Sequence, residues 1–223
     1  MPSLLMEILL VASLLLLGAL TLFNRHLVRA CTWFVLFALT VSFSWWWMGF
    51  PWLASIELLL GAVLTGAFLF HALGVGPTAK RPSGLLAGWH DHPPPRGRAL
   101  MRLLPALAML AMLGLALEDL AEGRASVALW SCGMGLLGLG LWAFALHRHL
   151  IRRLLGFNVI GTGIFLILVS LADETERAAA HGLIITGLVV AMLGTALGAL
   201  LIRRLEALEA QHGRQHAAGG HAI

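Results

Sequence analysis

Long apolar runs separated by short polar connections dominate the pattern of this chain. A helix needs about 20 apolar residues to cross a hydrocarbon core of roughly 30 Å. Seven segments approach that length and predict spans: about 4–23, 30–49, 53–73, 103–118, 126–146, 154–172 and 182–202, of which the fourth is the shortest. We therefore predict an all-α membrane protein with about seven transmembrane helices.

The composition strengthens this prediction. Apolar residues make up 59% of the 223 residues and charged residues only 12%, whereas a soluble domain has about 25% charged residues. The mean hydropathy is +0.88. These values exclude a soluble globule, a disordered chain and a disulfide-stapled secreted module. The two cysteines, Cys31 and Cys132, lie inside apolar runs and are expected to be small buried side chains.

The basic residues are sorted between alternate connections. Thirteen of the 15 Lys and Arg residues fall in the first, third and fifth connections and the tail, and only Arg124 and Arg177 fall in the others. Connections rich in Lys and Arg face the cytoplasm. We therefore predict an external N-terminus, a cytoplasmic C-terminus and a multi-pass protein of a bacterial or archaeal cytoplasmic membrane. The high pI reflects this sorting and does not indicate a nucleic-acid partner.

The chain divides into parts at a turn-rich connection. Residues 74–102 contain several glycines and the run Pro93-Pro94-Pro95, as expected for a cytoplasmic linker. The expected parts are a three-helix domain at 1–73, this linker, a connecting helix with an external loop at 103–125, a second three-helix domain at 126–204, and a disordered cytoplasmic tail at 205–223.

Glu57 is the most informative polar residue at membrane depth. It lies roughly 6–8 Å past the start of the third span, at 1.5 Å per residue. An ionisable residue inside a span is costly and is a candidate for function. Gly61 and Thr65 share its helix face at i+4 and i+8. The alternative is an interfacial Glu that reaches water, which is also our interpretation of Glu7.

A second polar set lies on the last two spans. It comprises Asn158, Thr162, Thr186 and Thr195. One interpretation is hydrogen bonding between helices, which is common in membranes. The other is a hydrated proton or cation path, for which Glu57, Thr65, Asn158, Thr162 and Thr186 are the candidate residues.

The histidines do not indicate a cofactor. A haem held by two His needs both at similar depth on different helices. His26, His71, His147 and His149 fall at expected cytoplasmic span ends, and His181 falls at an external one. The pair His90 and His92 in the Pro-rich loop is expected to be solvated. We predict no bound cofactor and no metal site.

The C-terminal domain resembles a known three-helix subunit. The stretch from Leu139 to Asn158, which includes His147-Arg148-His149 and Leu155-Gly156-Phe157-Asn158, is similar to the first hairpin of complex I chain 4L and of the C subunit of Mrp-type cation/proton antiporters. The last span, from Gly182 to Leu197, resembles the antiporter version. Complex I chain 4L has a glutamate where this chain has Asn158. That difference favours the antiporter-type branch.

Residues 18–73 resemble a second family, the three-helix D-type subunit of membrane-bound hydrogenases, which also forms the C-terminal extension of the large Mrp subunit. Pro51, Ala54, Glu57 and Gly61 fit the spacing of its signature, whereas Trp52 and Ile56 depart from it. The order of the two parts, D-type and then C-type, matches the gene order of these complexes.

Together the resemblances imply a fused small subunit of an Mrp-like or complex I-like assembly that translocates cations and protons. Its expected partners are larger antiporter-like membrane subunits, other small subunits and the lipid bilayer. Glu57 is the candidate for a proton or sodium path. The chain itself is not expected to be a redox enzyme. The alternatives are a purely structural scaffold subunit and an independent membrane carrier.

Overall fold

A computed structural model describes residues 2–74, 96–121, 127–147, 149–172 and 177–219. This part of the chain is entirely helical, without a strand. The helices are α1 (Pro2–Phe23), α2 (Leu27–Trp47), α3 (Pro51–Glu57), η1 (Leu58–Leu64), α4 (Thr65–Ala72), α5 (Arg96–Ala121), α6 (Val127–Leu146), α7 (Leu150–Leu171) and α8 (Arg177–Gly219). Because α3, the π-helix η1 and α4 form one continuous rod, the described part contains seven rods.

Six of these rods are long and apolar enough to cross a membrane, and they match six of the seven expected spans. The apolar part of α5, Leu104–Ala116, is shorter than the others. This agrees with the prediction that the fourth span is the shortest. The direction in which the chain crosses the membrane stays a prediction.

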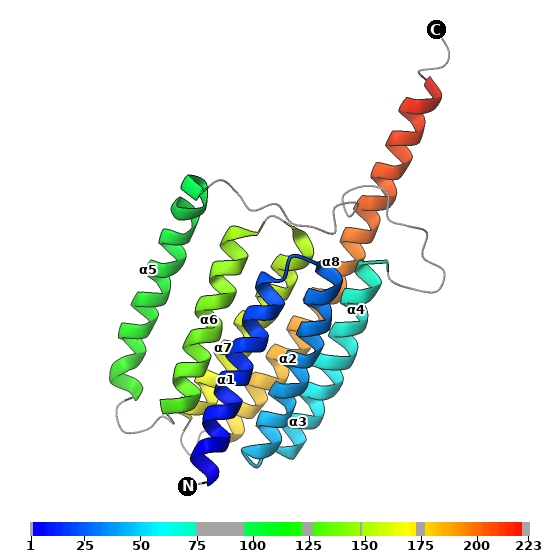
Figure 1. Cartoon of the computed structure of the whole chain (residues 1–223). Coiled ribbons are helices and arrows are strands. Elements are labelled where there is room, and N and C mark those ends of the chain that lie inside the picture. Colours follow the sequence, from blue (N-terminus) through cyan, green and yellow to red (C-terminus); the bar gives the residue numbers. More distant parts are fainter. Residues whose placement is uncertain (1, 75–95, 122–126, 148, 173–176, 220–223) are drawn as a thin grey trace.

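The helices lie side by side in a bundle (Figure 1). α5 stands at one edge and packs mainly against α6. α8 packs against α4 and α7 and continues far beyond the other helices, as a helix to Gly219. The sequence predicted a disordered tail over much of that continuation. Residues 75–95, which include the pair His90 and His92, lie outside the described residues.

α6 and α7 pack at backbone distance. A Cβ atom added to Gly163 would lie 2.8 Å from the carbonyl oxygen of Gly133 and 2.8 Å from the amide nitrogen of Leu137. One added to Gly140 would lie 3.1 Å from the carbonyl oxygen of Gly156. Small residues allow this close approach, which is the usual way in which membrane helices associate. The glycines therefore allow α7 to pack directly against the backbone of α6.

Candidate functional site

Glu57 is the last residue of α3, and its side chain is buried at 4% exposure. Within the described part of the chain, the carboxyl group makes no hydrogen bond and no ion pair. A carboxylate withdrawn from water is costly unless it is paired, hydrated or protonated. The sequence left open an interfacial position with access to water. The structure instead buries this carboxyl among helices.

A π-helix begins directly after Glu57. η1 spans Leu58–Leu64, and at its end both the backbone N–H and the side-chain hydroxyl of Thr65 donate to the carbonyl oxygen of Leu60, the hydroxyl at 2.7 Å. π-helical turns are rare and occur frequently at functional sites. The wider turn changes the α-helical spacing expected from the sequence, but it still brings Thr65 to the same cavity as Glu57.

Gly61 makes room for the carboxyl group. A Cβ atom added at this position would collide with Oε1 of Glu57 and lie 3.0 Å from its Cδ. The carboxyl of Glu57 therefore lies over Gly61. Because glycine has no side chain, it permits this close approach.

Glu57 lines a small cavity where the N-terminal and C-terminal helices meet. Its volume of about 20 Å³ is close to the space that one water molecule needs. The polar or small residues at its wall are Glu57, Gly61, Thr65, Asn158, Gly161 and Thr162. Aromatic and aliphatic side chains of α2, α7 and α8, among them Phe37, Phe165 and Leu188, complete the wall.

The polar groups of α7 at this cavity are oriented by their own hydrogen bonds. The side-chain amide of Asn158 donates to the carbonyl oxygen of Leu154 and to Oγ1 of Thr195, both at 2.9 Å. The hydroxyl of Thr162 donates to the carbonyl oxygen of Asn158 at 3.2 Å. The donors are thus used within α7 and between α7 and α8, and lone pairs of oxygen atoms remain. Such a cavity suits a group that brings a proton or a positive charge.

The structure brings together four of the five candidate residues of the proton or cation path. Glu57, Thr65, Asn158 and Thr162 all line the cavity. Thr186 lies apart from it: this residue is exposed, and its hydroxyl donates to the carbonyl oxygen of Gly182 at 2.9 Å. The interpretation of hydrogen bonding between helices is seen directly, because Asn158 joins α7 to Thr195 of α8. The proton or cation path stays a prediction.

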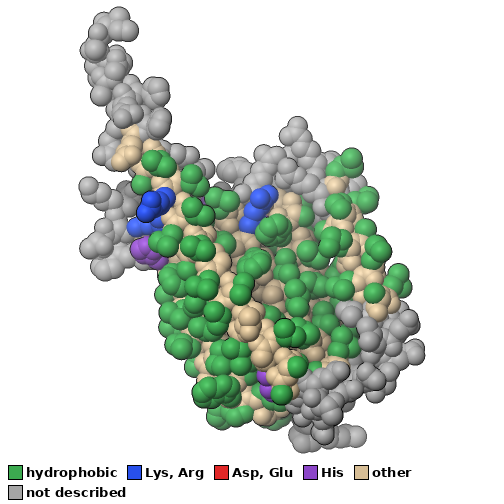
Figure 2. All heavy atoms as spheres, turned by 180° about the vertical axis from the view of Figure 1, so that it is seen from behind, with side chains coloured by type: hydrophobic (Ala, Val, Ile, Leu, Met, Phe, Trp, Pro, Cys, Tyr) green, Lys and Arg blue, Asp and Glu red, His purple; other side chains and the backbone are tan. Residues whose placement is uncertain are grey.

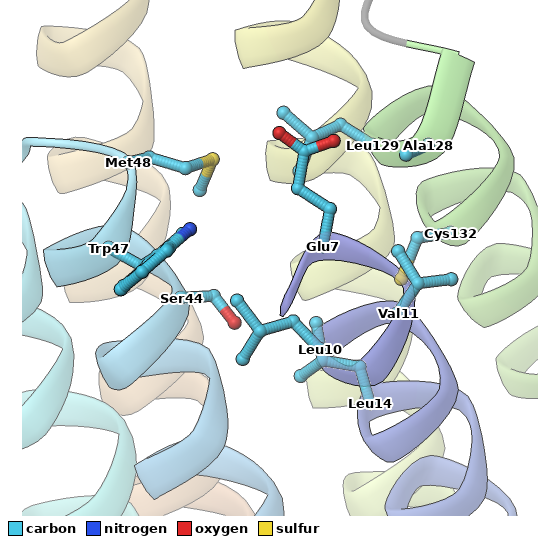
Figure 3. Close-up of a pocket in the computed structure, with 10 residues that line it drawn as sticks. All are labelled: Glu7, Leu10, Val11, Leu14, Ser44, Trp47, Met48, Ala128, Leu129 and Cys132. Atoms are coloured by element: carbon cyan, nitrogen blue, oxygen red, sulfur yellow. The ribbon is translucent and has the colours of Figure 1, made fainter. Parts of the chain in front are cut away.

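Glu7, the other acid in an apolar run, lies in a different environment. It is exposed and lines a separate pocket of about 130 Å³ between α1, α2 and α6. Figure 3 shows its carboxyl group pointing away from Leu10 and Leu14. Ser44, another polar residue of that pocket, donates its hydroxyl hydrogen to the carbonyl oxygen of Thr40. This difference in burial makes Glu7 a suitable control for Glu57.

Arg152 is a buried residue whose role the sequence did not reveal. It is 2% exposed, its Nη1 donates to the carbonyl oxygen of Leu22 at 2.7 Å, and its Nη2 donates to that of Asn24. A cation at a helix C-terminus satisfies free carbonyl groups and interacts favourably with the helix dipole. Arg152 thus ties the start of α7 to the end of α1. In the sequence it looked like one more loop charge beside Arg153.

Residues 129–212 match the family model of NADH-ubiquinone/plastoquinone oxidoreductase chain 4L. The matched residues cover most of α6, all of α7 and most of α8, and thus two of the four continuous rods that contribute to the cavity wall. The match supports the resemblance found for the C-terminal domain. It does not reach residues 18–73, whose resemblance to the D-type subunit stays a prediction. No curated protein and no solved structure matches the chain significantly.

Proposed function

We propose that this chain is a small membrane subunit of a complex I-like or Mrp-like assembly that translocates protons or cations. In this proposal it lies between larger antiporter-like subunits, and Glu57 loads and releases a proton or binds a cation. Six apolar helices and the chain 4L match of the C-terminal part support a subunit of a membrane complex. The role of Glu57 and the identity of the partners go beyond that match.

One observation carries the proposal for Glu57: a buried carboxyl group lies at a small cavity that also has polar groups of Thr65, Asn158 and Thr162 in its wall, without a partner of opposite charge among the described residues. A proton on the carboxyl, a water molecule that donates hydrogen bonds, or a cation with oxygen ligands would each satisfy this cavity. A group that exchanges protons must reach both charge states during turnover. Among the described residues no fixed cation lies beside Glu57 to hold it permanently ionised, so its charged state would depend on water or a cation that enters the cavity.

The position of the cavity also fits a coupling role. α3, η1 and α4 come from the N-terminal domain, whereas α7 and α8 come from the part that matches the chain 4L family. A movement of one domain against the other would change the surroundings of Glu57. A larger partner subunit that moves either domain would therefore influence the charge state of this residue.

The test is the substitution Glu57→Gln in the intact complex, assayed as cation-dependent proton movement in membrane vesicles. Gln keeps the shape of the side chain but does not titrate. We expect the exchange rate to fall by at least about tenfold while the complex still assembles. Glu57→Asp is expected to retain part of the activity with a shifted pH optimum. Glu7→Gln is the matched control, because it removes an exposed acid from an apolar helix, and it should exchange at the native rate.

Two outcomes would favour the alternatives. If the Glu57→Gln complex assembles and exchanges at the native rate across the pH range, Glu57 is structural and the chain is a scaffold. If the purified chain alone transports cations in liposomes, it is an independent carrier and the proposal of a subunit is wrong. Mass spectrometry of the co-purified proteins would identify the partners directly.

A further inference from the structure

A groove on the outer face of the bundle carries a second inference, which is independent of Glu57. Its volume is about 440 Å³, within the usual range for ligand sites. It runs between the end of α6, the start of α7 and the middle of α8. The walls are apolar, with Phe144, Phe157, Leu201 and Leu205 each more than one third exposed. One charged residue, Arg153, lines it.

Two contacts fix the guanidinium group of Arg153 at the rim. Its Nε donates to the carbonyl oxygen of His147 at 3.1 Å, and its Cζ lies 5.6 Å from the centre of the Phe144 ring. Within the described residues, its two Nη groups make no hydrogen bond. The planar fork of an Arg side chain is suited to binding a phosphate through two parallel hydrogen bonds. Arg153 is thus oriented in advance, with its fork still available.

Two glycines of α8 form part of the groove wall. A Cβ atom added to Gly194 would lie 3.8 Å from Cε1 of Phe157, an ordinary contact distance, so this wall has space for a larger side chain. A Cβ atom at Gly198 would lie 2.8 Å from Cδ2 of Leu154. The missing side chain at Gly194 therefore contributes to the width of the groove.

We propose that this groove binds an anionic phospholipid, with its phosphate on Arg153 and an acyl chain along the apolar wall of α7 and α8. The argument rests on charge and position. Arg153 lies in the first turn of an apolar span, where lipid headgroups meet the protein, and the groove extends from it along membrane-spanning helices. Basic pockets between transmembrane helices bind anionic headgroups in this way.

The arrangement of charge on this face agrees with such a site. Figure 2 shows that the described Lys and Arg side chains visible on this face lie near the end from which α8 projects. Below them the described surface is predominantly hydrophobic. A lipid with an anionic headgroup and two acyl chains has the same distribution of charge and apolar surface. A partner helix would cover the apolar wall but would not by itself supply an anion to Arg153.

Native mass spectrometry of the delipidated, purified protein, alone and in its complex, tests this proposal. The probes are phosphatidylglycerol and phosphatidylcholine with identical acyl chains. We expect the wild-type protein to retain phosphatidylglycerol preferentially. Arg153→Gln should reduce that preference by about fivefold, the effect of losing one basic residue at the membrane surface. Gly194→Leu, which fills the groove, should reduce the binding of both lipids.

Arg25→Gln is the matched control, because it removes an exposed Arg in the connection between α1 and α2, outside the groove. It should leave the preference unchanged. Equal binding of the two lipids by the wild-type protein, or an unchanged preference in Arg153→Gln, would overturn the proposal. So would a disulfide or cross-link from Gly194→Cys to a partner subunit in the intact complex, because the groove would then be a subunit interface.

Discussion

Two interfaces between helices of this molecule, here called seams, differ in what fills them. At the α6–α7 seam, glycines such as Gly133 and Gly163 bring two backbones into direct contact and leave no space for a side chain. At the seam between α3–η1–α4 and α7–α8, a buried carboxyl, an amide and hydroxyl groups lie in the wall of a small cavity, together with apolar side chains. The first seam tolerates no larger side chain at these glycines, because an added Cβ atom would lie 2.8 Å from backbone atoms of the facing helix. The second contains a group whose charge can change, and space for one water molecule beside it.

This difference separates a closely packed seam from the seam that we propose to be functional. α7 takes part in both seams: Gly156 and Gly163 face α6, while Asn158 and Thr162 line the Glu57 cavity. Dense packing on one side of α7 fixes the position of the polar groups on its other side. Substitutions at the two seams should therefore have different consequences, for stability at the first and for ion movement at the second.

The largest effect on stability is expected for Arg152→Leu, which leaves the carbonyl groups of Leu22 and Asn24 without this donor in an apolar environment. Loss of two hydrogen bonds from a charged donor is expected to cost about 2–4 kcal/mol. Thermal unfolding of the purified protein in detergent measures the change. Arg153→Leu at the adjacent, partly exposed position should cost much less. Equal losses would mean that the contact of Arg152 with α1 does not stabilise the fold.

Gly163→Ala is expected to destabilise the α6–α7 seam by about 1–3 kcal/mol, because the new methyl group meets backbone atoms of Gly133 and Leu137 that cannot move aside. Gly161→Ala is the control for stability. It lies two residues away on the same helix, where an added Cβ has no atom of a neighbouring helix within 4 Å. The same unfolding assay should show little change for this variant. A stable Gly163→Ala protein would contradict the close packing of this seam.

Gly61→Ala should have the smallest effect on stability, because the atoms nearest to the added methyl group belong to the flexible Glu57 side chain. We expect the carboxyl to be displaced and the exchange rate to fall partially while the protein stays folded. Gly66→Ala on the same rod is the control, since its added Cβ meets Val35 at 2.9 Å and not Glu57. Similar exchange rates in the two variants would indicate that the contact between Glu57 and Gly61 does not matter.

Most of the fold could be predicted because apolar run length is set by membrane thickness. The start of α7 shows the limit of that rule: the sequence placed it near residue 154, whereas the helix begins at Leu150. Arg152 and Arg153 shortened the apolar run in the sequence. In the structure, however, the guanidinium group of Arg152 donates hydrogen bonds to carbonyl oxygens at the end of α1 and directly after it. A charged residue that finds partners in another helix has no distinct signal in a single sequence.

The candidate site could be predicted only in part. Glu57, Gly61 and Thr65 lie on one rod, so helical spacing brought them together in the prediction. Their meeting with Asn158 and Thr162 depends on how α7 packs against the N-terminal helices, which spacing along the chain does not define. The π-helix after Glu57 was not predicted either, because a change in backbone hydrogen-bond register has no residue type that marks it.

The most direct test of the central claim is an infrared difference spectrum of the intact complex recorded between low and high pH. It reports protonation of carboxyl groups without depending on transport. We predict a carboxyl signal in the wild-type protein that is lost in Glu57→Gln and retained in Glu7→Gln. A spectrum that is identical in the wild-type and Glu57→Gln complexes would contradict the claim that Glu57 exchanges a proton in this cavity.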